Sequence, residues 1–288
     1  MYFLLRLLSW FFCLLPRRVA LGLGAALGWI WHTLIPVRRA VARENVRRSF
    51  PHWSRRQCRR VVRACYLELG RGAAELLRLP ALDRAEIEAW IEHRGFEHLE
   101  AARRAGRGVI AACAHFGAFD LLACAEALRG VQLAVVTRRL RVAGVERFWR
   151  WLRDNCGLER LPPDASILSL DRRLRRGAVL GLVIDQHMPP GRGIPVEFFG
   201  RPASTTPLPA ALALATGAAL LPVRIERLPQ GRLRATVDPP LAVDRKAERR
   251  AEIARVTRAL NAWLEERIRE RPDHWLWLHR RWKLPDSL

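Results

Sequence analysis

The stretch VIAACAHFGAFDLLACAEAL, residues 109–128, decides the fold. It begins as a run of small apolar residues, typical of a buried strand flanked by helices, and continues as a helix. His115 and Asp120 lie five positions apart at the point where the strand becomes the helix. In open α/β sheets, ligands gather at the carboxyl ends of the strands, so this join is a candidate active site.

Strands and helices alternate along the rest of the chain. Further strands are predicted over 131–137, 178–184, 219–228 and 232–240. Helices are predicted over 144–157, 164–177, 210–216 and 244–270, and, broken near Pro51, over 38–79. The Gly/Pro-rich segment 185–209 is predicted to be a loop too long to be a simple connector. This alternation favours a single α/β domain.

The composition points to an anionic partner. The chain has 288 residues, 50% of them hydrophobic, which is ample for a core. Its formal net charge is +22, and only Lys246 and Lys283 are lysines, so arginine supplies nearly all of the positive charge. Such an excess favours membrane lipid, nucleic acid or an acidic protein as partner.

The cysteines carry no metal or disulfide signature. They form no C-x-x-C pair, and their spacing indicates scattered buried thiols of a reducing compartment. The six are Cys13, Cys58, Cys65, Cys113, Cys124 and Cys156.

The N-terminus predicts a membrane anchor over residues 1–37. Residues 1–16 are apolar except for Arg6, and residues 19–37 contain no charge, a length close to that needed to cross a bilayer. No small-residue cleavage pattern follows, which favours a retained anchor over a signal peptide. The glycines at 22, 24 and 28 leave open a helix that lies in the interface instead of spanning the membrane.

The charges after this segment predict its orientation. Between Arg38 and Arg63 there are ten arginines and one acid, Glu44. By the positive-inside rule, the segment and all that follows stay on the cytoplasmic side of the inner membrane.

His115 and Asp120 suit general base catalysis. An aspartate that accepts from one imidazole nitrogen fixes the tautomer and leaves the other nitrogen basic. No G-x-S-x-G motif is present, so a hydrolase with a serine elbow is disfavoured, and a base without a protein nucleophile suits direct attack by a substrate hydroxyl. The plain alternative is a hydrogen-bonded histidine near a helix N-terminus, with Asp120 favourable to the helix dipole.

Four motifs in order carry a family resemblance. They are AHFGAFD, DQHMPPGRGIPVEFFGRPASTT, ALATGAALLPVRI and HWLWLHRRWK. Together they resemble the lysophospholipid acyltransferase superfamily, and within it the late acyltransferases of lipid A biosynthesis. The resemblance runs from about Arg38 to Lys283, and FFGRPAST (198–205) and WLWLHRRWK (275–283) are its most specific parts.

The resemblance implies an enzyme that moves a fatty acyl chain from an acyl carrier protein thioester to a hydroxyl of a phosphorylated glycolipid. The implied fold is a mixed-sheet α/β acyltransferase domain over 38–288, flanked by helices, behind the anchor. His115 would take the hydroxyl proton, and Asp120 would hold and stabilise the imidazolium. Backbone N–H groups near Gly117, or an arginine, are candidate oxyanion donors.

Other residues are candidates for substrate binding. Arg138 and Arg139 follow a predicted strand at its carboxyl end, and Arg201 lies in the FFGRP segment; guanidinium groups suit phosphate oxygens. Asp185 and Gln186 end another strand, where the family shows a DQ pair. His187 next to them lacks a carboxylate at ligand spacing, so no metal site and no cofactor are predicted.

The sequence leaves several points open. Leu208 and Pro209 stand where small, glycine-containing sequence is common in the family, which puts the identity of the acceptor in question. The tryptophan-rich ending suits a membrane-interface belt or core packing. Alternatives are acyl-CoA as donor, another lysolipid acceptor, a hydrolase in which His115 activates water, and a basic membrane-surface protein without chemistry. No nucleic-acid-binding signature is present, so nucleic acid is not an expected partner.

Overall fold

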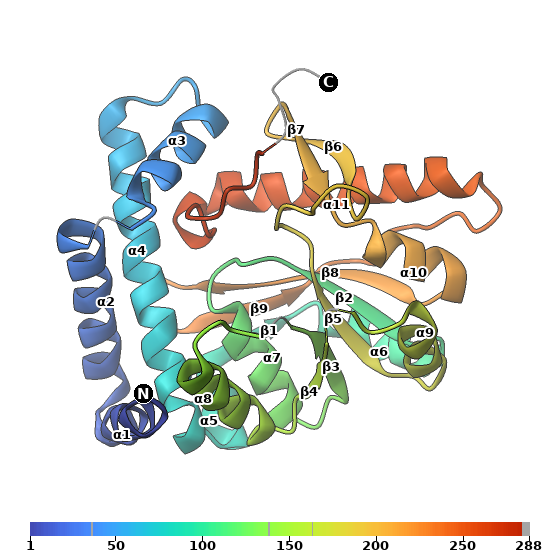
Figure 1. The fold of residues 1–288 in the computed structure, drawn as a ribbon. Coiled ribbons are helices and arrows are strands. Elements are labelled where there is room, and N and C mark those ends of the chain that lie inside the picture. The colour runs from blue at the N-terminus through green and yellow to red at the C-terminus, as the bar shows by residue number, and fades with distance from the viewer. Residues whose placement is uncertain (36, 138, 163, 284–288) are drawn as a thin grey trace.

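The apolar stretch before His115 forms β2 (Val109–Cys113), which lies inside a seven-stranded sheet (Figure 1). The computed structural model describes residues 1–35, 37–137, 139–162 and 164–283. In spatial order the strands of the sheet are β1 (Ile91–Arg94), β9 (Leu233–Val237), β8 (Ala219–Arg227), β2, β5 (Val179–Val183), β3 (Leu133–Val136) and β4 (Glu159–Leu161). Strand β9 is antiparallel to β8, and every other neighbouring pair is parallel. The predicted mixed-sheet α/β fold is therefore confirmed.

Helices cover both faces of the sheet, and a group of N-terminal helices stands at one side of it (Figure 1). The helices are α1 (Tyr2–Leu14), α2 (Arg17–Leu34), α3 (Arg39–Ser49), α4 (Arg55–Arg78), α5 (Arg84–Trp90), α6 (Phe96–Arg104), α7 (Phe119–Leu128), α8 (Ala143–Asp154), α9 (Ile167–Arg175), α10 (Leu208–Thr216) and α11 (Arg249–Glu270). Helices α9, α10 and α11 contribute to the core on one face, and α5 to α8 contribute to the core on the other. Short 3₁₀ turns lie at Leu79–Ala81 and Pro272–His274.

The register of β2 and β5 places the predicted site. These strands are parallel neighbours, and Cys113 of β2 is paired with Val183 of β5. His115 and Asp185 each follow two residues later, so both lie at the carboxyl edge of the sheet. The expected gathering of candidate residues at this edge therefore holds for these two.

The predicted strands and helices are present, but some elements were missed. Strands β1 and β4 are only four and three residues long and lie at the sheet edges, where a short apolar pattern is hard to detect. The segment 185–209, predicted to be a loop, contains a second, two-stranded sheet formed by β6 (Ile194–Phe198) and β7 (Arg201–Thr205).

The β6–β7 hairpin turns at Phe199 and Gly200. Both residues have a positive φ, 53° and 67°, as the type I′ turn of a two-residue hairpin requires. Phenylalanine rarely adopts this conformation. Its backbone N–H donates to Oε1 of Glu265 in α11 at 2.6 Å, which fixes the turn on the neighbouring helix.

The N-terminal helices pack closely on the rest of the chain. Gly24 and Gly28 of α2 face Gly70 of α4, and a Cβ added at any of the three would overlap backbone atoms of the facing helix. The α2–α4 contact joins the predicted anchor (1–37) to the predicted catalytic domain (38–288). The division of the chain into these two parts therefore stays a prediction. No single described helix has both the length and the apolar character to cross a membrane; α2 and α3 do so only as a sharply bent pair.

We expect Gly70→Ala to lower the free energy of unfolding by about 1–3 kcal/mol, because the new methyl group forces two backbones apart. Gly72→Ala, on the same helix in open space, is the matched control and should be neutral or slightly stabilising. Denaturant unfolding of the detergent-solubilised protein measures both. Equal stability of the two variants would contradict the close α2–α4 contact.

Candidate active site

His115 lies in a short loop between β2 and α7 that the C-terminal segment holds in place. The backbone N–H of Leu276 donates to the carbonyl oxygen of His115 at 3.0 Å, and that of Gly117 donates to the carbonyl of His274 at 2.9 Å. Gly117 has a φ of 58°, and a Cβ there would overlap the carbonyl oxygen of Ile225. The loop is therefore fixed by backbone contacts that leave no room for a side chain at residue 117.

The imidazole of His115 is paired with Asp185. Nδ1 of His115 lies 2.8 Å from Oδ1 of Asp185. Oδ2 of Asp185 accepts from the backbone N–H of His115 at 3.0 Å and from the indole Nε1–H of Trp275 at 2.8 Å. Only 3% of Asp185 is exposed. A buried carboxylate needs hydrogen-bond donors to stay charged, and both oxygens of Asp185 have them.

These contacts set the tautomer and the pKa values of the pair. Because Asp185 accepts from Nδ1–H, the lone pair of neutral His115 resides on Nε2. Burial alone would lower the pKa of His115, but the charge and hydrogen bond of Asp185 outweigh it and raise that pKa above 6.5. Burial acts in the opposite sense on Asp185, and its contacts with His115 and Trp275 hold its pKa below the ordinary value.

Gln186 lies at the other nitrogen of the ring. Its Nε2 is 3.1 Å from Nε2 of His115, and the tautomer makes the amide the donor. The nitrogen that would act as base is therefore covered by an amide that a substrate hydroxyl would have to displace.

The expected contact between Asp120 and His115 is replaced by another pairing. Oδ1 of Asp120, in the first turn of α7, accepts from Nη2 of Arg153 in α8 at 2.6 Å. Asp185 takes the orienting position because the neighbouring parallel strand delivers its carboxylate directly to Nδ1. The charge of Asp120 still contributes to raising the pKa of His115.

The predicted arginines have different surroundings. Arg139 is exposed after β3, and Arg138 lies outside the described residues. Arg201 lies in β7 with its guanidinium 5.0 Å from the ring centre of Trp282. Phosphate binding by these side chains stays a prediction. Gly117, a candidate oxyanion donor, has its N–H bonded to His274, so that amide is already engaged.

The C-terminal segment supplies site residues that sequence reasoning did not assign. Trp275 and Trp277 are buried, which agrees with core packing and not with a membrane belt. Arg281 is fully buried, and its guanidinium donates to the carbonyl oxygens of Gln186 and Ser204 and to the hydroxyl of Thr205. Burial lowers the pKa of Arg281 to about 10. The spacing of Trp275, Trp277 and Arg281 at every second or fourth position, which places them on one side of an extended chain, was the sequence signal available for this role.

The six cysteines are free thiols and form no disulfide bond. Among the residues described by the structure, no three or more His, Cys, Asp or Glu side chains are grouped so that they could hold a metal ion.

The chain matches known proteins over a range that includes every residue of the site. The family described as bacterial lipid A biosynthesis acyltransferase matches residues 1–284. The chain is 32% identical over 161 residues to the phosphatidylinositol mannoside acyltransferase of Mycobacterium tuberculosis, a match that covers 53% of this chain and 50% of that protein. The corresponding protein of Mycolicibacterium smegmatis is 30% identical, with 73% of this chain and 77% of that protein covered.

Two more distant similarities were also found. The lipid A biosynthesis lauroyltransferase of Escherichia coli is 25% identical, with 95% of this chain and 88% of that protein covered. The crystal structure of a 1-acyl-sn-glycerophosphate acyltransferase from Thermotoga maritima aligns over 89% of this chain and 99% of that chain with 16% identity and a TM-score of 0.41.

The environment of His115 predicts opposite shifts of the pH–rate profile in two variants. A general base must be neutral to accept a proton, so with His115 in that role we expect activity to fall as the pH drops through the raised pKa of His115. Asp185→Asn removes the raising charge and should move the acidic limb to lower pH, with a loss of rate. Gln186→Glu adds a carboxylate beside Nε2 and should move it to higher pH. Initial rates between pH 5 and 9 measure both shifts, and an unmoved limb in both variants would contradict the assignment.

Proposed function

This chain belongs to the bacterial lipid A biosynthesis acyltransferase family, and we propose that it transfers a fatty acyl chain from an acyl carrier protein thioester to a hydroxyl of a phosphorylated glycolipid. The observation that carries the proposal is the His115–Asp185 pair, because it presents one basic nitrogen at the carboxyl edge of the sheet. The relatives are named for lipid A and phosphatidylinositol mannoside, so a sugar-containing lipid acceptor is the class they have in common. A lipid A precursor is the acceptor we favour.

In the proposed reaction, the acceptor hydroxyl displaces the amide of Gln186 and donates to Nε2 of His115. The oxygen attacks the thioester carbonyl carbon while its proton moves to Nε2, and Asp185 stabilises the imidazolium through Nδ1–H. The tetrahedral intermediate then breaks its carbon–sulfur bond, and the departing thiolate recovers the proton from Nε2. His115 ends neutral, and the products are the acylated lipid and the free thiol.

Two neighbours of His115 have supporting roles in this proposal. The displaced amide of Gln186 remains within reach of the incoming oxygen and can donate to it, which would position the hydroxyl. Asp120 adds negative charge near the imidazolium, and its pairing with Arg153 keeps that carboxylate on α7 directed toward α8.

Charge and hydropathy support the proposed location and partners. The exposed apolar side chains of α1 and α2 support a location at the inner membrane. The ten arginines from Arg38 to Arg63 favour the cytoplasmic face of that membrane for the catalytic domain. A net charge of +22 favours both an acidic carrier protein and an anionic lipid. Acyl-CoA as donor is the alternative.

We expect His115→Ala to lower the rate of acyl transfer by about 10²–10⁴-fold, because the variant lacks the general base. The assay combines the detergent-solubilised enzyme, a lipid A precursor and either acyl carrier protein thioester or acyl-CoA, and mass spectrometry detects the gain of one acyl group. His98→Ala, on α6, is a histidine control that should keep the wild-type rate. Near-normal turnover of His115→Ala would reject the proposed mechanism, and faster transfer from acyl-CoA would reject the proposed donor.

A further inference from the structure

We infer that α1 and α2 lie along one leaflet of the membrane, on the same side as the catalytic domain, and that the membrane-contacting surface continues from α1 over residues 139–142 to the sheet edge that holds His115. The inference rests on the proposed membrane location, and it replaces the spanning anchor by an interfacial one. Packing, charge and exposure each support it.

The first support is the helix that covers α2. Helix α2 buries Ala20, Leu21, Gly24 and Gly28, and its glycines meet α4 backbone to backbone. The part of α4 beside them, residues 63–75, contains four charged residues: Arg63, Glu68, Arg71 and Glu75. A spanning α2 would draw this stretch into the hydrocarbon region, where charged side chains are costly.

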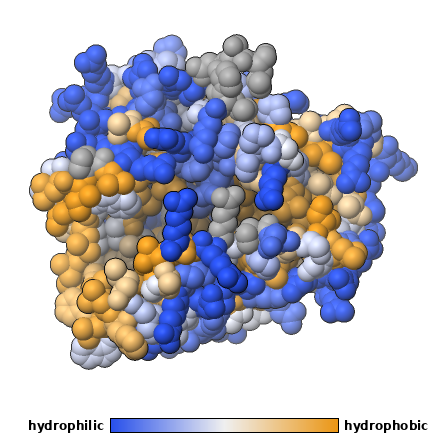
Figure 2. Space-filling view, in the orientation of Figure 1, coloured by the Kyte–Doolittle hydropathy of each residue, from blue (hydrophilic) through white to orange (hydrophobic). Residues whose placement is uncertain are grey.

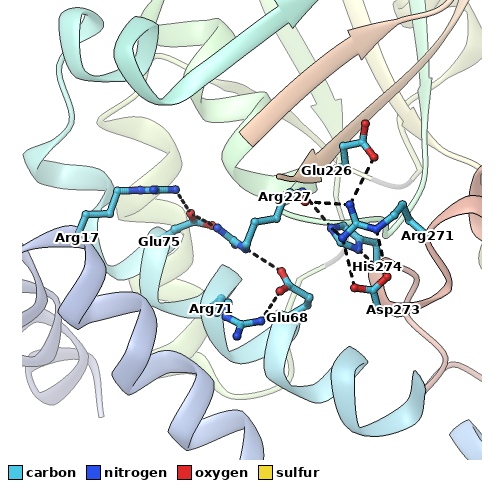
Figure 3. A network of polar contacts seen from close by, with 9 residues as sticks. All are labelled: Arg17, Glu68, Arg71, Glu75, Glu226, Arg227, Arg271, Asp273 and His274. Atoms are coloured by element: carbon cyan, nitrogen blue, oxygen red, sulfur yellow. Dashed lines mark hydrogen bonds and ion pairs between the residues drawn. The ribbon is translucent and has the colours of Figure 1, made fainter. Parts of the chain in front are cut away.

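The second support is the ion-pair network at the start of α2 (Figure 3). Nη2 of Arg17, the first residue of α2, donates to Oε1 of Glu75 at 2.8 Å. Glu75 also accepts two hydrogen bonds, both of 2.8 Å, from Arg227 at the end of β8, and Arg227 donates to Glu68 at 2.9 Å. Glu75 and Arg227 are buried. The start of α2 is thereby tied through buried charges to the central sheet of the catalytic domain.

The third support is the position of α1. The guanidinium of Arg6 lies 3.8 Å from the ring centre of Trp151, and that of Arg147 lies 4.4 Å from the ring centre of Tyr2, so α1 packs on α8. The hydroxyl of Ser9 donates to the carbonyl of Leu77 at 2.6 Å. If α2 crossed the bilayer, α1 would be on the opposite side from α8. These contacts therefore require α1 to be on the catalytic side.

The outer faces of α1 and α2 form a continuous apolar surface (Figure 2). Hydrophobic side chains gather at the left of that view, where α1 and α2 lie. The large ones are between 36% and 78% exposed, and they are Met1, Phe3, Leu4, Leu7, Leu8, Trp10, Phe11, Leu14, Val19, Leu23, Leu27, Trp29, Ile30, Leu34 and Ile35. An apolar face of this extent, with arginines nearby, suits a helix pair lying in the headgroup region of an anionic bilayer.

Residues 139–142 extend this surface toward the active site. Exposed Leu140 and Val142 alternate with exposed Arg139 and Arg141. The segment leads directly into α8, where a Cβ on Gly144 would touch Met1. It also follows β3, whose carboxyl end lies at the same sheet edge as His115. Alternating apolar and cationic side chains fit a bilayer surface with anionic headgroups, which would bring a membrane-embedded acceptor to the site.

The first test is the topology of the full-length protein in cells. Epitope tags at the N-terminus and, in a separate version, at the C-terminus are probed with protease in spheroplasts and in inverted membrane vesicles. We expect both tags to be protected in spheroplasts and cleaved in inverted vesicles. An N-terminal tag cleaved in spheroplasts would overturn the inference. The readout needs no activity, so it is independent of the proposed reaction.

The second test is binding to vesicles of phosphatidylethanolamine and phosphatidylglycerol. We expect the double variant Leu140→Asp/Val142→Asp to bind about tenfold more weakly in co-sedimentation, with unchanged thermal unfolding in detergent. The matched control is Ile167→Asp/Leu168→Asp, an apolar pair on α9 that is even more exposed. Helix α9 packs against α10 and β5, and this variant should change binding by less than twofold. Wild-type binding of the first variant, or an equal loss in both, would overturn the extension to residues 139–142.

Discussion

The site depends on the hydrogen bonds that the buried carboxylate of Asp185 accepts. This carboxylate accepts three hydrogen bonds, from Nδ1 and the backbone of His115 and from the indole of Trp275. Two of these donors belong to His115 in the loop after β2, and the third belongs to the C-terminal segment, so both segments converge on the end of β5. A negative charge with this little exposure is stable only while all of its donors are in place. The central sheet, the loop that carries His115 and the C-terminal segment up to Lys283 are therefore fixed together.

Arg281, on the same C-terminal segment as Trp275, is a second buried charged side chain near Asp185. Its guanidinium is fully buried and bonds to the carbonyls of Gln186 and Ser204 and to Thr205, so it joins the strand end that carries Asp185 to the β6–β7 hairpin. The charge of Asp185 favours the cationic form of Arg281, although burial opposes it. Segments that are far apart in the sequence thus hold His115 and Asp185 in place together.

The sequence was sufficient for the central strands, because short runs of small apolar residues between helices are typical of buried strands in an α/β sheet. It also placed His115 at a strand end, whereas the role of His115 as a base stays a prediction. It was insufficient for the partner of His115. Spacing along the chain favoured Asp120, but Asp185 is brought to Nδ1 by strand pairing, which local spacing does not encode. The β6–β7 hairpin was missed because its turn places Phe199 at a positive φ, a conformation that Glu265 of a distant helix supports.

The central claim is that neutral His115 carries its proton on Nδ1 and presents a basic Nε2. Nitrogen-15 NMR of the detergent-solubilised protein, labelled only at histidine and assigned with His115→Ala, tests it directly. At alkaline pH we expect a protonated nitrogen at Nδ1, coupled to its hydrogen, and an unprotonated Nε2 that gains its proton at a pH above the ordinary value of 6.5. A signal showing the proton on Nε2 in the neutral ring would contradict the account.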